Sequence, residues 1–240
     1  MPELAELLRS LGYDGISVVT TTYNEVRYIK PFVNAVRRAL TTVNHEVIIV
    51  DDSSPDGTYE EARRYADKAI VKPREGQTAG LLTGIREARY GLVVTLDVDL
   101  ENPPSLIPAL VEDALKRDCD VLVACRTEIP RVGERLTARA LSSKLCVHDI
   151  YSNFRVYRRD SVADVKLTLG ETFGAELLLR AIERGCRVCE YVYDPPPRRS
   201  KPRVGGRFTA NLRILKVLLK LLMATRGLRS EGLCMGPQQG

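Results

Sequence analysis

The stretch Leu92-Val93-Val94-Thr95-Leu96-Asp97-Val98-Asp99-Leu100-Glu101-Asn102-Pro103-Pro104 joins an apolar, β-rich run to three acids and a pair of prolines. The apolar run predicts a buried strand, and the prolines predict the first turn of a helix. In an open α/β sheet, ligands bind at the carboxyl ends of the strands, which is where Asp97 and Asp99 would lie. Two carboxylates this close repel each other unless a cation or a proton lies between them. We therefore expect a hard divalent cation here, and an acidic loop that caps the next helix is the alternative.

Strands and helices alternate on both sides of this stretch. Apolar, β-branched runs predict strands at residues 16–21, 46–50, 69–71, 92–96 and 120–125. Segments with helical spacing follow the first four of these runs. This order predicts an α/β fold with a doubly wound, mostly parallel, Rossmann-like sheet.

The second half of the chain has a different organisation. Helical patterns at 132–146 and 172–184 are each followed by a predicted strand, at 149–157 and 187–193. Three prolines at 195–197 end this region, a basic loop follows, and residues 208–226 have the pattern of a last helix. We expect one catalytic domain over residues 1–207 and a basic amphipathic helix and tail over 208–240.

The basic residues are concentrated near the C-terminal end. The chain of 240 residues is 44% hydrophobic and 28% charged, which is typical of a globular protein. Ten of its 36 Lys and Arg residues, and no acid, lie between Asp194 and Glu231, which leaves 26 basic against 31 acidic residues elsewhere. The basic segment should therefore meet something anionic. It lacks the interleaved aromatic residues that stack on bases, so nucleic acid is not the expected partner.

The six cysteines do not form a zinc-binding pattern in the sequence. Cys186 and Cys189 have the spacing of metal ligands, but no second pair or histidine cluster completes such a site. We expect buried structural thiols and a reducing compartment. The N-terminus has no signal-peptide pattern and no apolar run approaches the ~20 residues of a membrane span, so a cytoplasmic location is expected.

Four segments resemble those of a known family, each at the predicted end of a strand or in a loop beside it. They are Thr22–Glu25 (TYNE), Asp51–Thr58 (DDSSPDGT), Asp97–Pro104 (DVDLENPP) and Asp149–Arg155 (DIYSNFR). On these segments the chain resembles the family 2 glycosyltransferases with the GT-A fold, and within them the dolichyl-phosphate mannosyltransferases. The resemblance runs from Ile16 to Arg207, which is most of the chain.

The resemblance implies a metal-dependent site for a nucleotide sugar. Asp97, Asp99 and Glu101 would hold Mg²⁺ or Mn²⁺, which would bridge the two phosphates of the leaving group. Asp99 and Arg126 are the expected catalytic residues. The expected nucleotide-sugar-binding residues are Thr22, Tyr23, Glu25, Asp52, Asp97, Val98, Asp99, Arg126 and Arg203.

Individual roles follow from the chemistry of each side chain. Asp52 would accept hydrogen bonds from the base, while Asp51 would hold its loop. Tyr23 would stack on the base and Glu25 would bind ribose hydroxyls. For Glu25 and Glu101, an acid at the start of a helix remains the alternative.

Phosphate groups would be bound by arginines, because a guanidinium group fits phosphate oxygens well. Arg126 follows the fifth strand, and Arg203, with Arg207 as a further candidate, lies in the basic loop. No general base is evident, since His45 and His148 are the only histidines and a lone histidine is more often structural. A polyprenyl phosphate acceptor needs no base, because it is already anionic at neutral pH.

The last helix combines apolar residues with a basic face formed by Arg213, Lys216 and Lys220. Such a helix suits a membrane interface, and packing on the core or on another chain is the alternative. Together with this helix, the family resemblance implies an inverting enzyme, peripheral at the cytoplasmic face of a membrane, that transfers mannose from GDP-mannose to dolichyl or another polyprenyl phosphate.

Three alternatives remain open from the sequence. The donor could instead be UDP-glucose, or the acceptor a different molecule. A membrane-anchored partner subunit could hold the chain at the membrane. Departures from the family pattern at Glu101, Asn153 and Arg207 also leave open a non-catalytic nucleotide-sugar-binding or membrane-adaptor protein.

Overall fold

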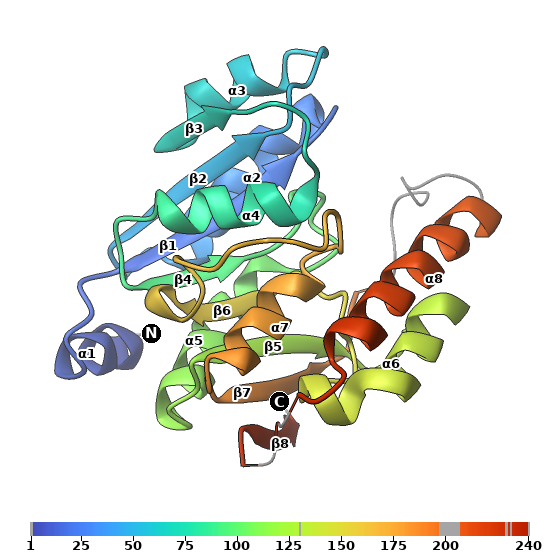
Figure 1. The fold of residues 1–240 in the computed structure, drawn as a ribbon. Helices are drawn as coiled ribbons and strands as arrows, with labels where there is room; N and C mark the ends of the chain where they lie inside the picture. The colour runs from blue at the N-terminus through green and yellow to red at the C-terminus, as the bar shows by residue number, and fades with distance from the viewer. Residues whose placement is uncertain (1, 130, 197–206, 229, 231, 240) are drawn as a thin grey trace.

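The structure is a computed structural model of the chain, and it describes residues 2–129, 131–196, 207–228, 230 and 232–239. Within these residues, eight strands form one mixed sheet in the order β3-β2-β1-β4-β6-β5-β7-β8 (Figure 1). The strands are β1 (Ile16–Thr22), β2 (His45–Asp51), β3 (Lys68–Val71), β4 (Leu92–Thr95), β5 (Val121–Arg126), β6 (Arg155–Arg158), β7 (Val188–Tyr193) and β8 (Cys234–Gln239). The predicted doubly wound, mostly parallel α/β fold is confirmed.

Helices cover both faces of the sheet, as the continuous apolar strands require. The α-helices are α1 (Pro2–Ser10), α2 (Val26–Ala39), α3 (Thr58–Tyr65), α4 (Gln77–Arg86), α5 (Ile107–Lys116), α6 (Val132–Leu145), α7 (Ala175–Glu183) and α8 (Arg207–Ala224), with single 3₁₀ turns at Pro104–Leu106 and Arg159–Ser161. One buried apolar cluster joins α1, α2, α3 and α5 to the sheet, and a second joins α4, α6, α7 and α8 to its other face (Figure 1).

Glycines let α4 pack closely on the sheet. A Cβ atom at Gly80 would lie 2.6 Å from Thr21 Cγ2, and one at Gly84 would lie 2.3 Å from Val19 Cγ1. Such distances are well inside van der Waals contact, so a larger residue at either position would push the helix away. The first turn of α4 is thereby held close to the carboxyl ends of β1 and β4.

The antiparallel strand β6 is inserted between β4 and β5. Its first residue, Arg155, pairs with Thr95 on one side and Val123 on the other. Because β6 runs against its neighbours, its amino end lies where β4 and β5 have their carboxyl ends. The segment 149–155 is therefore brought to the same edge of the sheet as Asp97.

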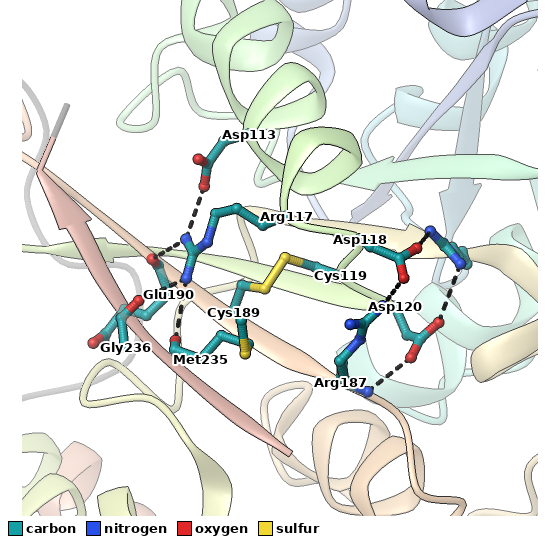
Figure 2. The surroundings of a disulfide bond; sticks show 11 residues. Asp113, Arg117, Asp118, Cys119, Asp120, Arg187, Cys189, Glu190, Met235 and Gly236 are labelled. Atoms are coloured by element: carbon teal, nitrogen blue, oxygen red, sulfur yellow. Dashed lines mark hydrogen bonds and ion pairs between the residues drawn. A yellow bond between two sulfur atoms is a disulfide. The ribbon is translucent and has the colours of Figure 1, made fainter. Parts of the chain in front are cut away.

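The C-terminal strand β8 forms an edge of the sheet, parallel to β7. Figure 2 shows Arg117 at this edge, where its guanidinium donates to the carbonyl oxygens of Glu190 at 3.0 Å, Met235 at 3.2 Å and Gly236 at 2.6 Å. A salt bridge of 2.9 Å to Asp113 orients the same side chain. The strand β8 is not predicted from the sequence, because the Met, Gly, Pro and Gln residues within it have no β-strand pattern.

Four of the six cysteines form disulfides. Cys119 is bonded to Cys189, as Figure 2 shows, and Cys146 is bonded to Cys234. Cys125 and Cys186 are free. The prediction of six thiols is therefore wrong for four of them, because residues 70 and 88 positions apart in the sequence meet through the sheet order. The expectation of a reducing compartment rested on those thiols, and disulfides are rare in such a compartment, so the expectation is no longer supported.

The helix α8 packs on the second apolar cluster through one face only. Val217, Leu218 and Leu221 are buried there, and the predicted basic residue Lys220 donates to the carbonyl oxygen of Leu169. Among the described residues, no helix combines the length and the apolar character needed to cross a bilayer.

The disulfides predict a thiol count. Alkylation of the denatured, unreduced protein should label two thiols, Cys125 and Cys186, and alkylation after reduction should label all six. Reduction should also lower the free energy of unfolding by about 2–5 kcal/mol, since each bond restricts a long loop of the unfolded chain. Intact-mass spectrometry and urea titration measure the two quantities. Six labelled thiols before reduction would contradict the assignment.

Candidate active site

A cavity of about 600 Å³ lies at the carboxyl ends of β1, β2, β4 and β5. All of the predicted donor-site residues that the structure describes line it: Thr22, Tyr23, Glu25, Asp52, Asp97, Val98, Asp99 and Arg126, together with the proposed metal ligand Glu101. Arg203 lies outside the described residues, as does the side chain of Arg207. The parallel strands thus bring together side chains that are up to about a hundred positions apart in the sequence.

Two loops on the β1 and β2 side are held together by hydrogen bonds. The backbone N–H groups of Asn24 and Glu25 donate to Ser54 Oγ and Thr58 Oγ1, each at 2.9 Å, and that of Val26 donates to Asp56 Oδ2 at 3.4 Å. Val26 is the first residue of α2 and Asn24 and Glu25 directly precede it, so no helical carbonyl is available to these N–H groups. The segment 51–58 therefore caps the neighbouring helix as well as its own.

Asp51 and Asp52 point to different surroundings. Asp51 is 1% exposed and accepts bonds from Thr22 Oγ1, Ser54 Oγ and Ser54 N–H, so it holds the loop as expected. Asp52 lines the cavity and accepts from Lys72 Nζ at 2.9 Å and from the N–H groups of Glu75 and Gly76 at 3.0 Å. Burial alone would raise the pKa of Asp52, but these hydrogen bonds and the Lys72 charge lower it below its usual value.

Tyr23 is stacked against Arg74, which was not among the predicted site residues. The guanidinium carbon of Arg74 lies 3.8 Å from the ring centroid of Tyr23, and Arg74 Nη1 donates to the hydroxyl at 3.0 Å. One face of the ring is thus covered by a cation. A base that stacks on Tyr23 has either to use the other face or to displace Arg74.

The acids after β4 lie on the opposite wall. Asp97 Oδ1 accepts a hydrogen bond of 2.7 Å from Gln77 Nε2, in the first turn of α4. Asp99 Oδ1 accepts from the backbone N–H of Glu101 at 3.1 Å. Burial raises the pKa of Asp97, with Glu101 adding to the rise and Arg126, Gln77 and Arg155 opposing it. The neighbouring donors and positive charges therefore do not fully offset the cost of burying an ionised Asp97.

Arg126 is paired with carboxylates on the third wall. Its guanidinium makes two bonds to Asp149, of 2.7 Å from Nε and 3.0 Å from Nη2, and Nη2 lies 3.5 Å from Glu134 Oε2. Glu134 also accepts from Arg131 Nη1 at 3.1 Å. Arg126 lines the cavity with a side chain that is 22% exposed, so it can contact a ligand while Asp149 holds it in place.

The segment before β6 completes this wall. Ser152 Oγ donates to the carbonyl oxygen of Ala124 at 2.6 Å, and the carbonyl oxygen of Asn153 accepts from Thr95 Oγ1 at 2.7 Å. Arg155 is fully buried and donates to the carbonyl oxygens of Ser152, Gly174 and Ile150 at 2.7–2.8 Å. A buried arginine bonded to three carbonyls fixes the path of the backbone here.

The cavity is acidic as a whole. Among the described residues that line it, seven are acidic and three are basic: Glu25, Asp52, Asp97, Asp99, Glu101, Glu128 and Glu134 against Lys72, Arg126 and Arg131. The basic side chains are each paired with one of these acids or with Asp149. A cation bound near Asp97 would relieve this excess of negative charge.

Several side chains of the cavity were not found from the sequence. Lys72, Gln77 and Glu134 are brought to the cavity by β3, α4 and α6. Tyr151 and Phe173 also line it and meet edge to face, with ring centroids 6.2 Å apart. Nothing in the local sequence around Lys72 or Gln77 marks them, because their partners lie 20 positions away in each case.

Comparison with known proteins gives a family match over most of this region. The model of "Glycosyl transferase family 2" matches residues 17–166. A dolichol-phosphate mannosyltransferase from Pyrococcus furiosus is 34% identical over 189 residues, which are 71% of this chain and 53% of that protein. A dodecaprenyl-phosphate galacturonate synthase from Rhizobium johnstonii is 34% identical over 65% of this chain and 51% of its own length. The chain thus spans about half the length of these relatives.

Solved structures give the same fold at lower identity. Glucosyl-3-phosphoglycerate synthase from Mycobacterium tuberculosis, in complex with Mn²⁺, UDP and phosphoglyceric acid, has a TM-score of 0.76 at 21% identity and covers 93% of this chain and 82% of its own. Mannosyl-3-phosphoglycerate synthase from Rubrobacter xylanophilus has a TM-score of 0.70 at 18% identity, with 96% and 82% covered.

The cross-loop cap predicts the effect of a nearly isosteric change. Thr58 is fully buried, and Thr58→Val removes the oxygen that accepts the N–H of Glu25. We expect a loss of about 1–2 kcal/mol in the free energy of unfolding, because a buried helix-end donor is left unpaired. Thr58→Ser keeps the oxygen and serves as the control in the same urea titration. Equal losses in the two variants would show that packing, not the hydrogen bond, accounts for the effect.

Proposed function

Because the chain belongs to glycosyl transferase family 2, we propose that it is an inverting, metal-dependent glycosyltransferase that moves a sugar from a nucleoside diphosphate to a polyprenyl phosphate at a membrane surface. The favoured donor is GDP-mannose and the favoured acceptor dolichyl phosphate. The observation that carries the proposal is the acidic cavity at the strand ends, which Asp97, Asp99 and Glu101 line together with Arg126. Two relatives that are 34% identical to this chain over the matched region are named for polyprenyl-phosphate sugars of this kind.

In this proposal the nucleoside lies on the β1 and β2 side of the cavity. Asp52 keeps unused lone pairs beside its bonds to Lys72 and the backbone, so it can accept a hydrogen bond from a ring N–H. Tyr23 provides a stacking face, with Arg74 on the other side of the ring or displaced. Glu25, which is 6% exposed, binds ribose hydroxyls.

A divalent cation fits the donor set after β4. Asp97 and Asp99 offer hard carboxylate oxygens. Burial raises the pKa of Asp97, and a bound cation would oppose that rise. In the described part of the chain, Asp97, Asp99 and Glu101 do not converge into a closed set of three ligand atoms. This suits Mg²⁺ or Mn²⁺, which bind through one or two carboxylates together with substrate phosphates and water. Such an ion stabilises negative charge on the departing diphosphate.

The chain's own residues orient the reacting groups. Gln77 holds the carboxylate of Asp97, and Asp149 holds the guanidinium of Arg126 toward the cavity. Arg126 binds a phosphate oxygen of the donor or acceptor, and Arg203 adds a second guanidinium from the basic loop. An oxygen of the acceptor phosphate attacks the anomeric carbon as the bond to the diphosphate breaks. The acceptor needs no base, since a phosphate monoester has a second pKa near ~6.

The outer face of α8 supports a lipid acceptor. Leu212, Leu215, Leu219, Leu222 and Met223 are 37–60% exposed and fall on one side of this helix. Arg213 and Lys216 are exposed beside this apolar stripe. The buried side of the same helix reaches the cavity through Ile214. A helix that is apolar outward, with basic residues along its edge, is typical of an anionic membrane interface.

The location proposed with this function is peripheral, at the cytoplasmic face of a membrane, with a membrane-anchored partner subunit as a further component. Disulfides are rare in the reducing cytosol of most cells and common in the intracellular proteins of hyperthermophiles. The two disulfides therefore restrict a cytoplasmic location to a cell of the second kind.

Two other functions are tested by the same assays. A UDP-glucose-dependent enzyme, or one with another phosphorylated acceptor, is favoured by the fold shared with the phosphoglycerate glycosyltransferases, whose structures hold Mn²⁺ or Mg²⁺ with UDP. A panel of GDP-mannose and UDP-glucose against polyprenyl phosphate and 3-phosphoglycerate separates these reactions. A non-catalytic binding or adaptor protein would transfer sugar in none of the combinations.

We expect transfer to depend on the carboxylates after β4. Asp99→Asn should lower kcat/KM by more than about 100-fold, because charge stabilisation worth several kcal/mol is lost. Chelation of divalent cations should have a similar effect, reversed by Mn²⁺. Asp164→Asn, at an exposed position outside the cavity, is the matched control. Activity that survives both chelation and Asp99→Asn would remove the metal from the proposal.

We expect membrane binding to depend on the apolar stripe of α8. The double variant Leu219→Ser and Met223→Ser should weaken binding to vesicles of anionic phospholipid, measured by flotation, by more than about a hundredfold, because two exposed apolar side chains, worth roughly 1.5–3 kcal/mol each when buried, are lost. Leu11→Ser, at a residue that is 50% exposed near the other end of the molecule, is the control. Flotation unchanged in the α8 variant would discard the lipid role of this helix and leave the family activity standing.

A further inference from the structure

Behind the Arg126 wall of the cavity lies a group of side chains that the proposed function does not use. Cys125 is on β5, His148 precedes the segment that leads to β6, and Glu190 is on β7. One candidate ligand atom from each lies within 4.8 Å of the other two. The sequence separates them by 23 and 42 positions, so no local motif predicts the group.

The geometry points to a zinc site, and we propose that Cys125 Sγ, His148 Nδ1 and a carboxylate oxygen of Glu190 bind one Zn²⁺ ion, with a solvent molecule as the fourth ligand. Tetrahedral bonds of about 2.0–2.3 Å put neighbouring ligand atoms roughly 3.3–3.8 Å apart, which the observed spacing allows with small side-chain movements. Sulfur with nitrogen selects a borderline-soft ion over Mg²⁺ or Ca²⁺. The site is thus distinct in chemistry from the all-oxygen site proposed at Asp97.

The histidine has the orientation of a metal ligand. His148 Nε2 lies 3.2 Å from the carbonyl oxygen of Arg126, so Nε2 carries a proton and donates. Nδ1 contacts Glu190 Oε1 and donates a proton to it in the absence of metal, and this hydrogen bond raises the pKa of His148. Zn²⁺ would take the place of that proton between Nδ1 and the carboxylate. Ligating histidines in metalloproteins commonly donate their other N–H to a backbone carbonyl in this way.

The other two ligands are buried and fixed by the backbone. Cys125 is 0% and Glu190 is 7% exposed. Burial and the nearby charges of Glu190 and Asp149 raise the pKa of the Cys125 thiol, and the backbone N–H of Asp149, which donates to the sulfur, opposes this only in part. The thiol is therefore protonated without a metal and would lose its proton to bind one. Glu190 is anchored through its carbonyl oxygen by Arg117 and follows Cys189 of the disulfide (Figure 2). Metal binding therefore requires little ordering of these two residues.

Solvent can reach the remaining coordination position. The side chain of His148 is 35% exposed, whereas a closed structural site would bury all of its ligands. When Zn²⁺ binds, the Cys125 thiol proton and the His148 Nδ1 proton pass to solvent, and the thiolate sulfur and the Nδ1 lone pair form the bonds to the ion. The ion would link β5, β7 and the segment that carries Asp149. It would thereby hold the backbone on either side of the Arg126–Asp149 pair more rigidly.

Cobalt tests the proposal, because Co²⁺ in a zinc site reports its ligands in the absorption spectrum. The full chain, with disulfides intact and one equivalent of Co²⁺, should show a thiolate-to-cobalt charge-transfer band, and one equivalent of Zn²⁺ should abolish it. The band should persist in Cys186→Ser, which removes the other free thiol, and in Asp97→Asn/Asp99→Asn, which removes the oxygen site. Cys125→Ser and His148→Gln should lack it or weaken it by more than tenfold in affinity.

Stability provides an independent readout. Zn²⁺ should raise the Tm of the unmodified chain and of Asp97→Asn/Asp99→Asn, because a ligand that binds only the folded state stabilises it. His148→Gln, at a partly exposed residue, should fold and lose the rise. The proposal is overturned if the folded chain shows no charge-transfer band. It is also overturned if the His148→Gln variant retains the Zn²⁺-dependent rise in Tm. The group is then a histidine–glutamate ion pair beside a buried thiol. Neither result bears on sugar transfer.

Discussion

The half-buried carboxylate of Asp97 follows β4 and faces the cavity among other acids, and the rest of the site is arranged around this constraint. A single hydrogen bond from Gln77 and the more distant charges of Arg126 and Arg155 do not offset its burial, so its pKa is raised. A carboxylate in such a position is costly for a protein that binds nothing there. It is useful for one that takes up a cation together with an anionic substrate, since the cation then supplies the missing charge.

Orientation of β6 links this site to the second half of the chain. Because β6 is antiparallel between β4 and β5, the segment from Asp149 to Arg155 comes to the edge where Asp97 lies. Asp149 then fixes Arg126, and the buried Arg155 fixes the backbone that carries Ser152 and Asn153. The donor side is built from the parallel half of the sheet, and the opposite wall is built from the reversed strand and α6.

The sequence predicted what depends on local pattern. Continuous apolar runs identify β1, β2, β4 and β5, and their last residues identify the acidic edge, because parallel strands have to align their carboxyl ends. The sequence did not predict side-chain contacts between segments that are far apart in the chain. Lys72 meets Asp52, and Gln77 meets Asp97, only once β3 and α4 are in place. The disulfides were missed for the same reason, since Cys119 and Cys146 meet partners 70 and 88 positions away, whereas β8 was missed because its own residues have no β-strand pattern.

The bond between Cys146 and Cys234 makes the second part of the chain a covalent ring. A protease that cuts once between residues 147 and 233, the basic loop included, produces two polypeptides that stay attached to each other. Nicked and intact molecules would migrate together until a reductant is added. A cut in the basic loop would therefore leave α8 and β8 covalently attached to the rest of the chain.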